Sequence, residues 1–373
     1  MIDTSFRSLF ETNMGITSGE RTLLFTDTIR DDEIVTAIDR DRRERLAAMA
    51  GEAAAFAGRI YGNCRFVSFP ATVASGAEPP EAVWRAALGD ATVDELQQEG
   101  LLERLLTKSA TEEDLAIARG KVVASTDAVQ IIVALANNST SHTRFRSLMN
   151  ATGCRYASLP HFDPEMMFSS MQVDWDALAI RTRRLAELVT QALRVTLTTP
   201  DGTNLVMGVA GRVAKSDDGL LTAPGSFGNL PAGEAFLAPV EGTTQGVLVI
   251  SFAPTRKLSS PLYLTISLGN VVEIEGDDPY REKLEEKFRS SPLNRNIAEL
   301  GIGTNGKATR PDNVLEAEKI LGTVHIALGD NAGFGGTVST PFHEDYVLYK
   351  PTLVLEMPDG VSVTVLDDGK LLV

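Results

Sequence analysis

The stretch Arg194-Val-Thr-Leu-Thr-Thr-Pro-Asp-Gly-Thr-Asn-Leu-Val-Met207 marks the point at which the pattern of the chain changes. Two runs rich in β-branched and apolar residues flank Pro200-Asp-Gly-Thr203, a turn sequence, so the stretch predicts a β-hairpin. Further short apolar runs follow it and predict strands, with a helix near 280–290. These strands are expected at 246–252, 261–267, 270–274 and 351–356. The second half of the chain is therefore expected to be rich in β-structure.

Before the hairpin, short apolar runs alternate with longer amphipathic stretches. The runs occupy residues 21–26, 64–69, 121–125 and 129–135, and the longer stretches occupy residues 32–58, 93–107 and 173–193. Strands separated by helices predict a parallel sheet with helices packed on it. We therefore expect an α/β protein of two domains. Residues 1–190 would form an N-terminal parallel sheet with flanking helices, and residues 191–373 a β-rich α+β metal-binding domain.

Composition sets the expected environment of the protein. The 373 residues, 43% of them apolar, suffice for two buried cores. A net charge of -15 disfavours nucleic acid and anionic membranes as partners. Since the N-terminus lacks a secretion-signal pattern and no apolar stretch has transmembrane length, we expect a soluble, cytoplasmic protein. Cys64 and Cys154 are far apart, as expected of free thiols in a reducing compartment.

Histidines and carboxylates near the C-terminus predict a metal site. His325 and His343 are two of only four histidines in the chain. Asp345 lies two residues after His343, so both side chains would leave the same face of a strand. Imidazole and carboxylate donors together suit zinc, manganese or iron. The other two histidines are weaker candidates, because His142 is expected beside a helix start and His161 in a loop.

Other motif matches predict no additional chemistry. Gly301-Ile-Gly-Thr-Asn-Gly306 has the spacing of a dinucleotide-binding loop, which requires a helix immediately afterwards. The following Lys307-Ala-Thr-Arg-Pro311 does not start a helix, so a nucleotide site is not expected. Neither the GxSxG nor the HExxH pattern occurs in the sequence.

The last third of the chain resembles a known enzyme family. The segments that carry the resemblance are Asn229-Leu-Pro-Ala-Gly-Glu-Ala-Phe-Leu-Ala-Pro-Val-Glu-Gly242, Asn296-Ile-Ala-Glu-Leu-Gly-Ile-Gly-Thr-Asn305, Glu318-Lys-Ile-Leu-Gly-Thr-Val-His-Ile-Ala-Leu-Gly-Asp-Asn331, Phe334-Gly-Gly336 and His343-Glu-Asp345. In order and spacing they resemble the aminopeptidase T (AmpS-like) metallo-aminopeptidase family, a distant relative of 2,5-dihydroxypyridine dioxygenase. The similarity spans most of the chain.

The resemblance implies a homodimer with a two-metal site that holds zinc, cobalt or manganese. The implied ligands are Glu234, Glu299, His325, His343 and Asp345. The family's acid–base glutamate best matches Glu318, and Glu316 is the alternative because the gap to the first ligand histidine is longer than in the family. For Glu241, both a role beside the ligands and simple exposure stay open.

One position departs from the family pattern. The family has a tyrosine shortly after the first ligand histidine, where this chain has Ala332 and Gly333. Tyr346 and Tyr349 are the candidates to replace it.

Three functions follow from these residues. The first is a hydrolase that uses metal-activated water to cleave an N-terminal residue from peptides, or a related small amide. The second is an Fe(II)-dependent ring-cleaving dioxygenase of the 2,5-dihydroxypyridine type, which would need two histidines and one carboxylate around one iron. His343 and Asp345 could supply two of the three, but this chain has Glu299 where a further histidine is expected. The third is a metal-binding relative without catalytic activity, for which the missing tyrosine is the argument.

Overall fold

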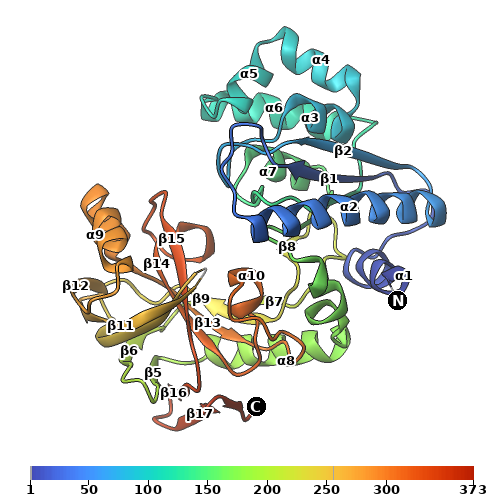
Figure 1. The fold of residues 1–373 in the computed structure, drawn as a ribbon. Coiled ribbons are helices and arrows are strands. Elements are labelled where there is room, and N and C mark those ends of the chain that lie inside the picture. The colour runs from blue at the N-terminus through green and yellow to red at the C-terminus, as the bar shows by residue number, and fades with distance from the viewer. Residues whose placement is uncertain (1, 255) are drawn as a thin grey trace. The chain divides into compact units, whose positions relative to one another are not determined.

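The computed structural model describes residues 2–254 and 256–373, in which the chain divides into two units (Figure 1). Unit 1 extends to Gln172 and also includes Gly219–Pro231. Unit 2 comprises Val173–Asp218 and Ala232–Val373. Among the described residues, no helix combines the length and the apolarity needed to cross a lipid bilayer.

Unit 1 is built on a parallel sheet with the strand order β2-β1-β3-β4-β8. Its strands are β1 (Thr22–Thr28), β2 (Cys64–Pro70), β3 (Ile131–Ala134), β4 (Arg155–Ser158) and β8 (Phe227–Asn229). Its helices are α1 (Ile2–Arg7), η1 (Ser8–Asn13), α2 (Ala37–Ile60), α3 (Glu81–Leu88), α4 (Asp90–Gln98), α5 (Leu101–Leu106), α6 (Glu112–Ala124), α7 (Arg144–Ala151), η2 (Pro164–Phe168) and η3 (Ser170–Gln172). Figure 1 shows α2 against one face of the sheet and α3 and α6 beyond the other. Because helices cover both faces, β1 is buried along six of its seven residues.

Unit 2 contains two antiparallel sheets. The eight-stranded sheet has the order β12-β11-β10-β6-β5-β16-β17-β18, and the five-stranded sheet, here called the site sheet, has the order β15-β14-β13-β9-β7. The strands of the eight-stranded sheet are β5 (Arg194–Thr198), β6 (Asn204–Gly208), β10 (Gln245–Ala253), β11 (Arg256–Ser267), β12 (Asn270–Glu275), β16 (Thr352–Glu356), β17 (Ser362–Asp367) and β18 (Lys370–Leu371). Those of the site sheet are β7 (Lys215–Asp217), β9 (Glu234–Leu237), β13 (Ile297–Gly303), β14 (Val324–Gly329) and β15 (His343–Leu348). The helices of unit 2 are α8 (Trp175–Thr190), α9 (Tyr280–Ser290), η4 (Pro292–Arg295), α10 (Val314–Ala317) and η5 (Ala332–Phe334).

The two sheets of unit 2 share one hydrophobic core. Leu197 and Leu205, from the hairpin strands, belong to the same buried cluster as Leu300 and Ile326 of the site sheet. Since side chains alternate between the faces of a strand, the neighbours of these site-sheet residues must face away from the core. This alternation positions the metal-ligand candidates.

The expected fold class is confirmed: a parallel sheet with helices in the first part of the chain, and large antiparallel sheets in the second. The domain division differs from the expected single boundary near residue 190. Helix α8 packs on β7 and β9 and so belongs to unit 2. Residues 219–231 return to unit 1, because β8 pairs in parallel with β4.

Two local expectations were wrong. The apolar run at 121–125 is the last turn of α6, a helix that begins at a capping box formed by Thr111 and Asp114. The stretch 93–107 is not one helix but two, because Gly100 adopts a left-handed conformation with φ of 66° between α4 and α5.

Candidate metal centre

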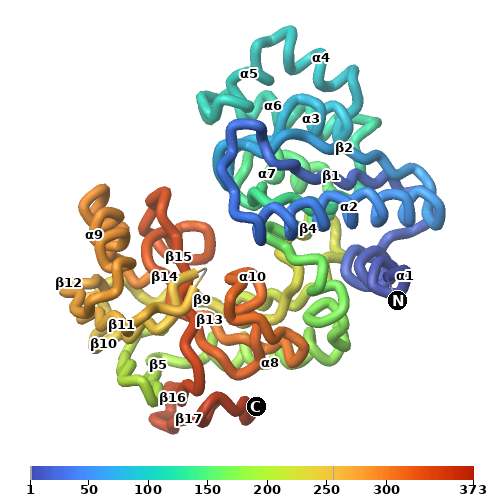
Figure 2. Tube along the Cα trace, in the orientation of Figure 1, coloured from blue at the N-terminus to red at the C-terminus, as the bar shows by residue number. Residues whose placement is uncertain are grey.

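One face of the site sheet collects the predicted ligands. On each strand, core residues alternate with polar ones: Ala235 faces the core while Glu234 does not, and Ile326 faces the core while His325 does not. The same alternation on β13 and β15 places the remaining ligand candidates on this face, and Figure 2 shows β15, β14, β13 and β9 as neighbours. The structure thus brings together all five expected ligands, which are Glu234, Glu299, His325, His343 and Asp345.

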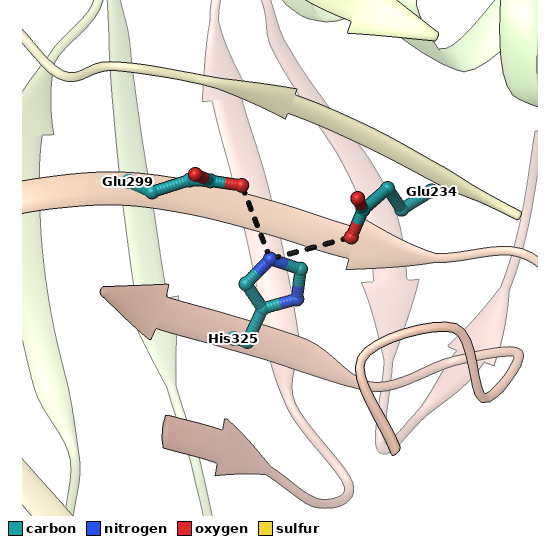
Figure 3. Close-up of side chains that lie close together, drawn as sticks. All are labelled: Glu234, Glu299 and His325. Atoms are coloured by element: carbon teal, nitrogen blue, oxygen red, sulfur yellow. Dashed lines mark hydrogen bonds and ion pairs between the residues drawn. The ribbon is translucent and has the colours of Figure 1, made fainter. Parts of the chain in front are cut away.

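Glu299 lies at the centre of this group. Its Oε1 is 3.3 Å from Nε2 of His325, and its Oε2 is 3.5 Å from Nε2 of His343. Glu234 Oε2 lies 3.4 Å from the same His325 nitrogen, as Figure 3 shows, and Asp345 Oδ1 lies 3.5 Å from His343 Nε2. Two triads result, Glu234–Glu299–His325 and Glu299–His343–Asp345, and each could hold a metal ion. They share one carboxylate.

The glycines of Gly301-Ile-Gly303 have a structural role in this sheet. Both lie inside β13. Gly301 pairs directly with His325, and a Cβ added at Gly301 would lie 2.0 Å from the imidazole ring. Nδ1 of His325 is buried without a hydrogen bond to any described residue, so the contacts of Nε2 with Glu299 and Glu234 and the packing against Gly301 together orient the ring. The motif therefore accommodates a histidine and does not form a nucleotide-binding loop.

Two further charged residues at the centre, Lys319 and Asp217, were not predicted from the sequence. The ammonium of Lys319, 1% exposed, lies 2.5 Å from Glu234 Oε1, 3.3 Å from Glu318 Oε2 and 3.7 Å from Asp217 Oδ2. Asp217 is opposite Glu234 in the pairing of β7 with β9. A lysine that follows a glutamate usually indicates a solvated pair, and nothing local in the sequence reveals that this lysine is buried.

The centre carries an excess of negative charge. Five carboxylates surround one ammonium and two imidazoles, so even doubly protonated imidazoles would not balance them. Burial raises the pKa of Glu318 to about 8, and the neighbouring Asp345 carboxylate adds to this shift. Burial likewise raises the pKa of Asp217 to about 7, with Glu234 contributing. Without a metal ion, protons have to neutralise part of this charge.

The two histidines hold protons strongly for the same reason. Burial alone would lower the pKa of His325, but its hydrogen bond with Glu299 and the charge of Glu234 raise it to about 9. Burial is also outweighed at His343, where Asp345 and Glu299 raise the pKa to about 10. Divalent cations would occupy this field in place of the protons.

A buried carboxylate oxygen without a hydrogen bond supports this fit. Oε2 of Glu234 accepts no hydrogen bond from any described residue, although it is fully buried. Leaving such an atom without a hydrogen bond is costly, and its one described charged contact is His325 Nε2 at 3.4 Å within the first triad. A cation bound by Glu234, Glu299 and His325 would satisfy it. The mixed imidazole and carboxylate donors suit a divalent metal.

The centre is closed at one end and open at the other. His325 is 1% exposed, whereas the His343 side chain is 32% exposed. The ring of Phe334 stands perpendicular to that of His343, with 5.8 Å between the centroids. The carbonyl of Asp330 lies 2.8 Å from Nδ1 of His343, and this contact fixes the orientation of the ring.

The loop that carries Phe334 is held by Glu241, whose role the sequence did not decide. Glu241 Oε1 accepts hydrogen bonds from the Asn331 side chain at 3.2 Å and from the Thr337 backbone at 2.7 Å. Its other oxygen pairs with Arg212. Glu241 therefore supports the loop beside His343 and is not a free surface carboxylate.

The acid–base candidates occupy different environments. Glu318 lies beside the ligand cluster, where Asp345, Glu234 and Lys319 are its charged neighbours. Glu316 instead accepts a hydrogen bond from the Thr309 backbone at 2.7 Å and has Arg310 and Asp312 as its charged neighbours. The geometry favours Glu318 over Glu316.

Neither candidate tyrosine reaches the ligands. Tyr346 faces the core, where its hydroxyl donates to Glu344 at 2.8 Å and lies 3.1 Å from that of Tyr280. The ring of Tyr349 packs on Phe252 with 5.1 Å between centroids, and its hydroxyl bonds to no described residue. Outside the cluster, His142 immediately precedes Thr143, the N-cap of α7, and His161 lies in a turn with φ of 53°.

Comparison with known proteins places this centre in a family of enzymes. The family model of NicX, 2,5-dihydroxypyridine 5,6-dioxygenase, matches residues 83–373. The structure of 2,5-dihydroxypyridine dioxygenase from Pseudomonas putida KT2440 aligns with a TM-score of 0.70 at 17% identity, covering 100% of this chain and 96% of that one. Wild-type AmpT from Thermus thermophilus aligns with a TM-score of 0.62 at 14% identity, covering 100% and 99%. No curated protein matches by sequence.

At such identities the two structures establish the shared fold alone. The family model covers well over half of the chain and reaches through every strand of the site sheet. The chain therefore belongs to the 2,5-dihydroxypyridine 5,6-dioxygenase family.

Proposed function

We propose that the centre is the active site of a metal-dependent hydrolase, which cleaves an N-terminal residue from peptides or cleaves a related small amide. The supporting observation is the position of Glu299, which directs one carboxylate oxygen to His325 and the other to His343. A carboxylate shared between two triads suits a pair of divalent cations such as zinc, cobalt or manganese.

Such cations would lower the pKa of a water molecule and polarise the scissile carbonyl. Glu318 would take the proton of the attacking water and pass it to the nitrogen of the leaving amine. Its carboxyl group is buried beside the ligand cluster, with Asp345 and Glu234 among its charged neighbours, which suits a general base at this position. Substrate would approach from the side of His343, because His325 is buried. Phe334 offers an apolar surface there.

A ring-cleaving dioxygenase is the second candidate, and the family match favours it. A mononuclear Fe(II) oxygenase uses two histidines and one carboxylate and keeps open positions for oxygen and substrate. His343 and Asp345 would supply two of these ligands. The acidic surroundings, with Glu299 between the two histidines, favour the hydrolase instead.

The test measures both reactions with the same preparations. Metal-free protein is loaded with zinc, cobalt, manganese or Fe(II) and assayed anaerobically against short peptides with free or acetylated amino termini. We expect free amino acid from the unblocked peptides, none from the blocked ones, and no dependence on oxygen. Oxygen consumption coupled to loss of a dihydroxylated pyridine, without peptide cleavage, would replace the hydrolase with the dioxygenase. Inactivity in both assays would favour a non-catalytic metal-binding protein.

A further inference from the structure

Lys319 is a buried cation next to the ligand cluster that the proposed reaction does not use. It is the one lysine among the largest fully buried side chains of the described chain. It follows α10, and its ammonium reaches Glu234, Glu318 and Asp217. A lysine is rarely buried completely unless it is paired, so its burial here needs a reason.

The contact with Glu234 is asymmetric. Lys319 donates a hydrogen bond of 2.5 Å to Oε1 of Glu234, and no other described residue donates to this carboxylate. Oε2 is left without a hydrogen bond and faces Nε2 of His325 at 3.4 Å. The lysine thus occupies one oxygen and presents the other to the triad. Asp217, which pairs with Glu234 across β7 and β9, also contacts the ammonium, at 3.7 Å.

We propose that Lys319 is a positioning residue that holds Glu234 as a one-oxygen metal ligand. It thereby controls metal affinity at the triad Glu234–Glu299–His325, but not at the triad Glu299–His343–Asp345. This inference rests on the metal centre of the proposed function. The two metal positions then differ in what orients their ligands. Lys319 orients Glu234 in one triad, whereas the backbone carbonyl of Asp330 orients His343 in the other.

The charge of Lys319 and its hydrogen bond to Glu234 have opposite effects on metal affinity. A nearby ammonium repels a metal cation, so its removal would tighten binding if repulsion dominated. Three carboxylates contact the ammonium, however, and two of them, Asp217 and Glu318, lie outside the triad and offset part of its charge. Its hydrogen bond to Glu234 has no replacement among the described residues. Loss of such a support typically weakens metal binding about 10- to 100-fold, so the positioning effect is expected to dominate.

The experiment titrates metal-free protein with Co(II) and Zn(II) and resolves the binding steps by calorimetry and by the visible spectrum of Co(II). The wild type is expected to bind two equivalents. Lys319→Met should weaken one step about 10- to 100-fold and leave the other unchanged. Lys319→Arg, which keeps the charge and the donors, should restore most of the lost affinity. His343→Ala should weaken the opposite step, which assigns each step to its triad.

A second variant covers the case in which Lys319→Met does not fold, as judged by circular dichroism. Asp217→Asn removes a partner of the ammonium without changing a ligand, and should weaken the same step by a smaller factor. The positioning role would be overturned if folded Lys319→Met bound metal at the triad Glu234–Glu299–His325 as tightly as the wild type or more tightly. If Lys319→Met does not fold, the same result in Asp217→Asn would overturn it. A wild type that binds one equivalent would overturn it too, whereas a wild type that binds no metal would remove the proposed function itself.

Discussion

Among single residues, Glu299 has the widest influence, because both metal triads include it. Glu299→Gln keeps the size of the side chain but removes the charge that two cations would share, so we expect affinity to fall at both positions. His343→Ala removes a donor from one triad, so the protein should lose one equivalent of bound metal. Metal content after gel filtration, measured by mass spectrometry, distinguishes the two outcomes. His142→Ala, on an exposed histidine outside the cluster, is the control and should retain full content. Equal loss in both cluster variants would argue against a shared carboxylate.

Glu318 separates catalysis from metal binding. Glu318→Gln keeps the shape of the side chain but cannot transfer a proton, a contribution worth about 10²- to 10⁴-fold in rate. We expect kcat for peptide cleavage to fall by such a factor while the metal content stays at the wild-type level. Glu316→Gln is the matched control, since Glu316 bonds to the Thr309 backbone outside the cluster. A rate loss confined to Glu316→Gln would reverse the assignment.

The histidine pKa values predict how metal affinity depends on pH. In the metal-free protein the neighbouring carboxylates raise the pKa of His325 to about 9 and that of His343 to about 10. Metal and protons compete for these nitrogens, so apparent affinity should rise as pH increases from 6 towards 9 and fall as pH decreases. The expected slope is about tenfold per pH unit for each proton displaced. Calorimetry in buffers of different ionisation enthalpy counts the released protons, and affinity independent of pH would contradict the prediction.

Among the elements, β13 shows how a strand can be built around a ligand on its neighbour. Gly301→Ala would place a methyl group 2.0 Å from the His325 ring, and buried overpacking of this kind typically costs about 1–3 kcal/mol. We expect a lower free energy of unfolding in urea and a loss of metal at the His325 triad. Gly306→Ala is the control, because its nearest contact would be an ordinary 3.6 Å to Leu321. Wild-type stability and metal content in Gly301→Ala would show that the His325 ring can shift away from the added methyl group without loss of metal binding.

Sequence predictions were accurate where the pattern lay within one segment, and they failed where a feature depends on contacts between segments. The hairpin of β5 and β6 and the bounds of α9 follow from turn residues and periodicity within the segment itself. The strand β13 was not predicted, and its glycines drew notice for the spacing of a dinucleotide-binding loop, whereas Gly301 makes room for His325 of β14. That contact depends on register between strands, which a single segment does not encode.

The same distinction applies to the site. His343 and Asp345 were found together because a two-residue spacing places both on one face of a strand. Lys319 and Asp217 were missed, since their meeting with Glu234 depends on three separate elements, β7, β9 and the segment after α10. The family resemblance supplied Glu234 as a ligand, which local chemistry alone would have placed in solvent.

On the scale of the whole molecule, the chain crosses between its two units three times. The segment 219–231 leaves unit 2 to add β8 to the parallel sheet of unit 1. The alternation of short apolar runs predicted one boundary near residue 190, and it does not encode the parallel pairing of β8 with β4 that returns this segment to unit 1. Each unit still has a core of its own, one around Phe25, Trp84 and Phe145 and the other around Leu197, Leu300 and Ile326.

Separate cores predict that metal stabilises the two units unequally. All five expected ligands lie in unit 2, and a ligand present at 100 times its Kd adds about 2.7 kcal/mol to the state that binds it. Hydrogen exchange read by mass spectrometry, with and without a chelator, should show that metal slows exchange in β14 and leaves β3 nearly unchanged. The His343→Ala variant, compared in the same way with and without a chelator, should show a smaller difference in β14, since one triad has lost a donor. Equal protection of β3 and β14 by metal would mean that the two units unfold as one cooperative structure, and that the metal centre stabilises the whole chain.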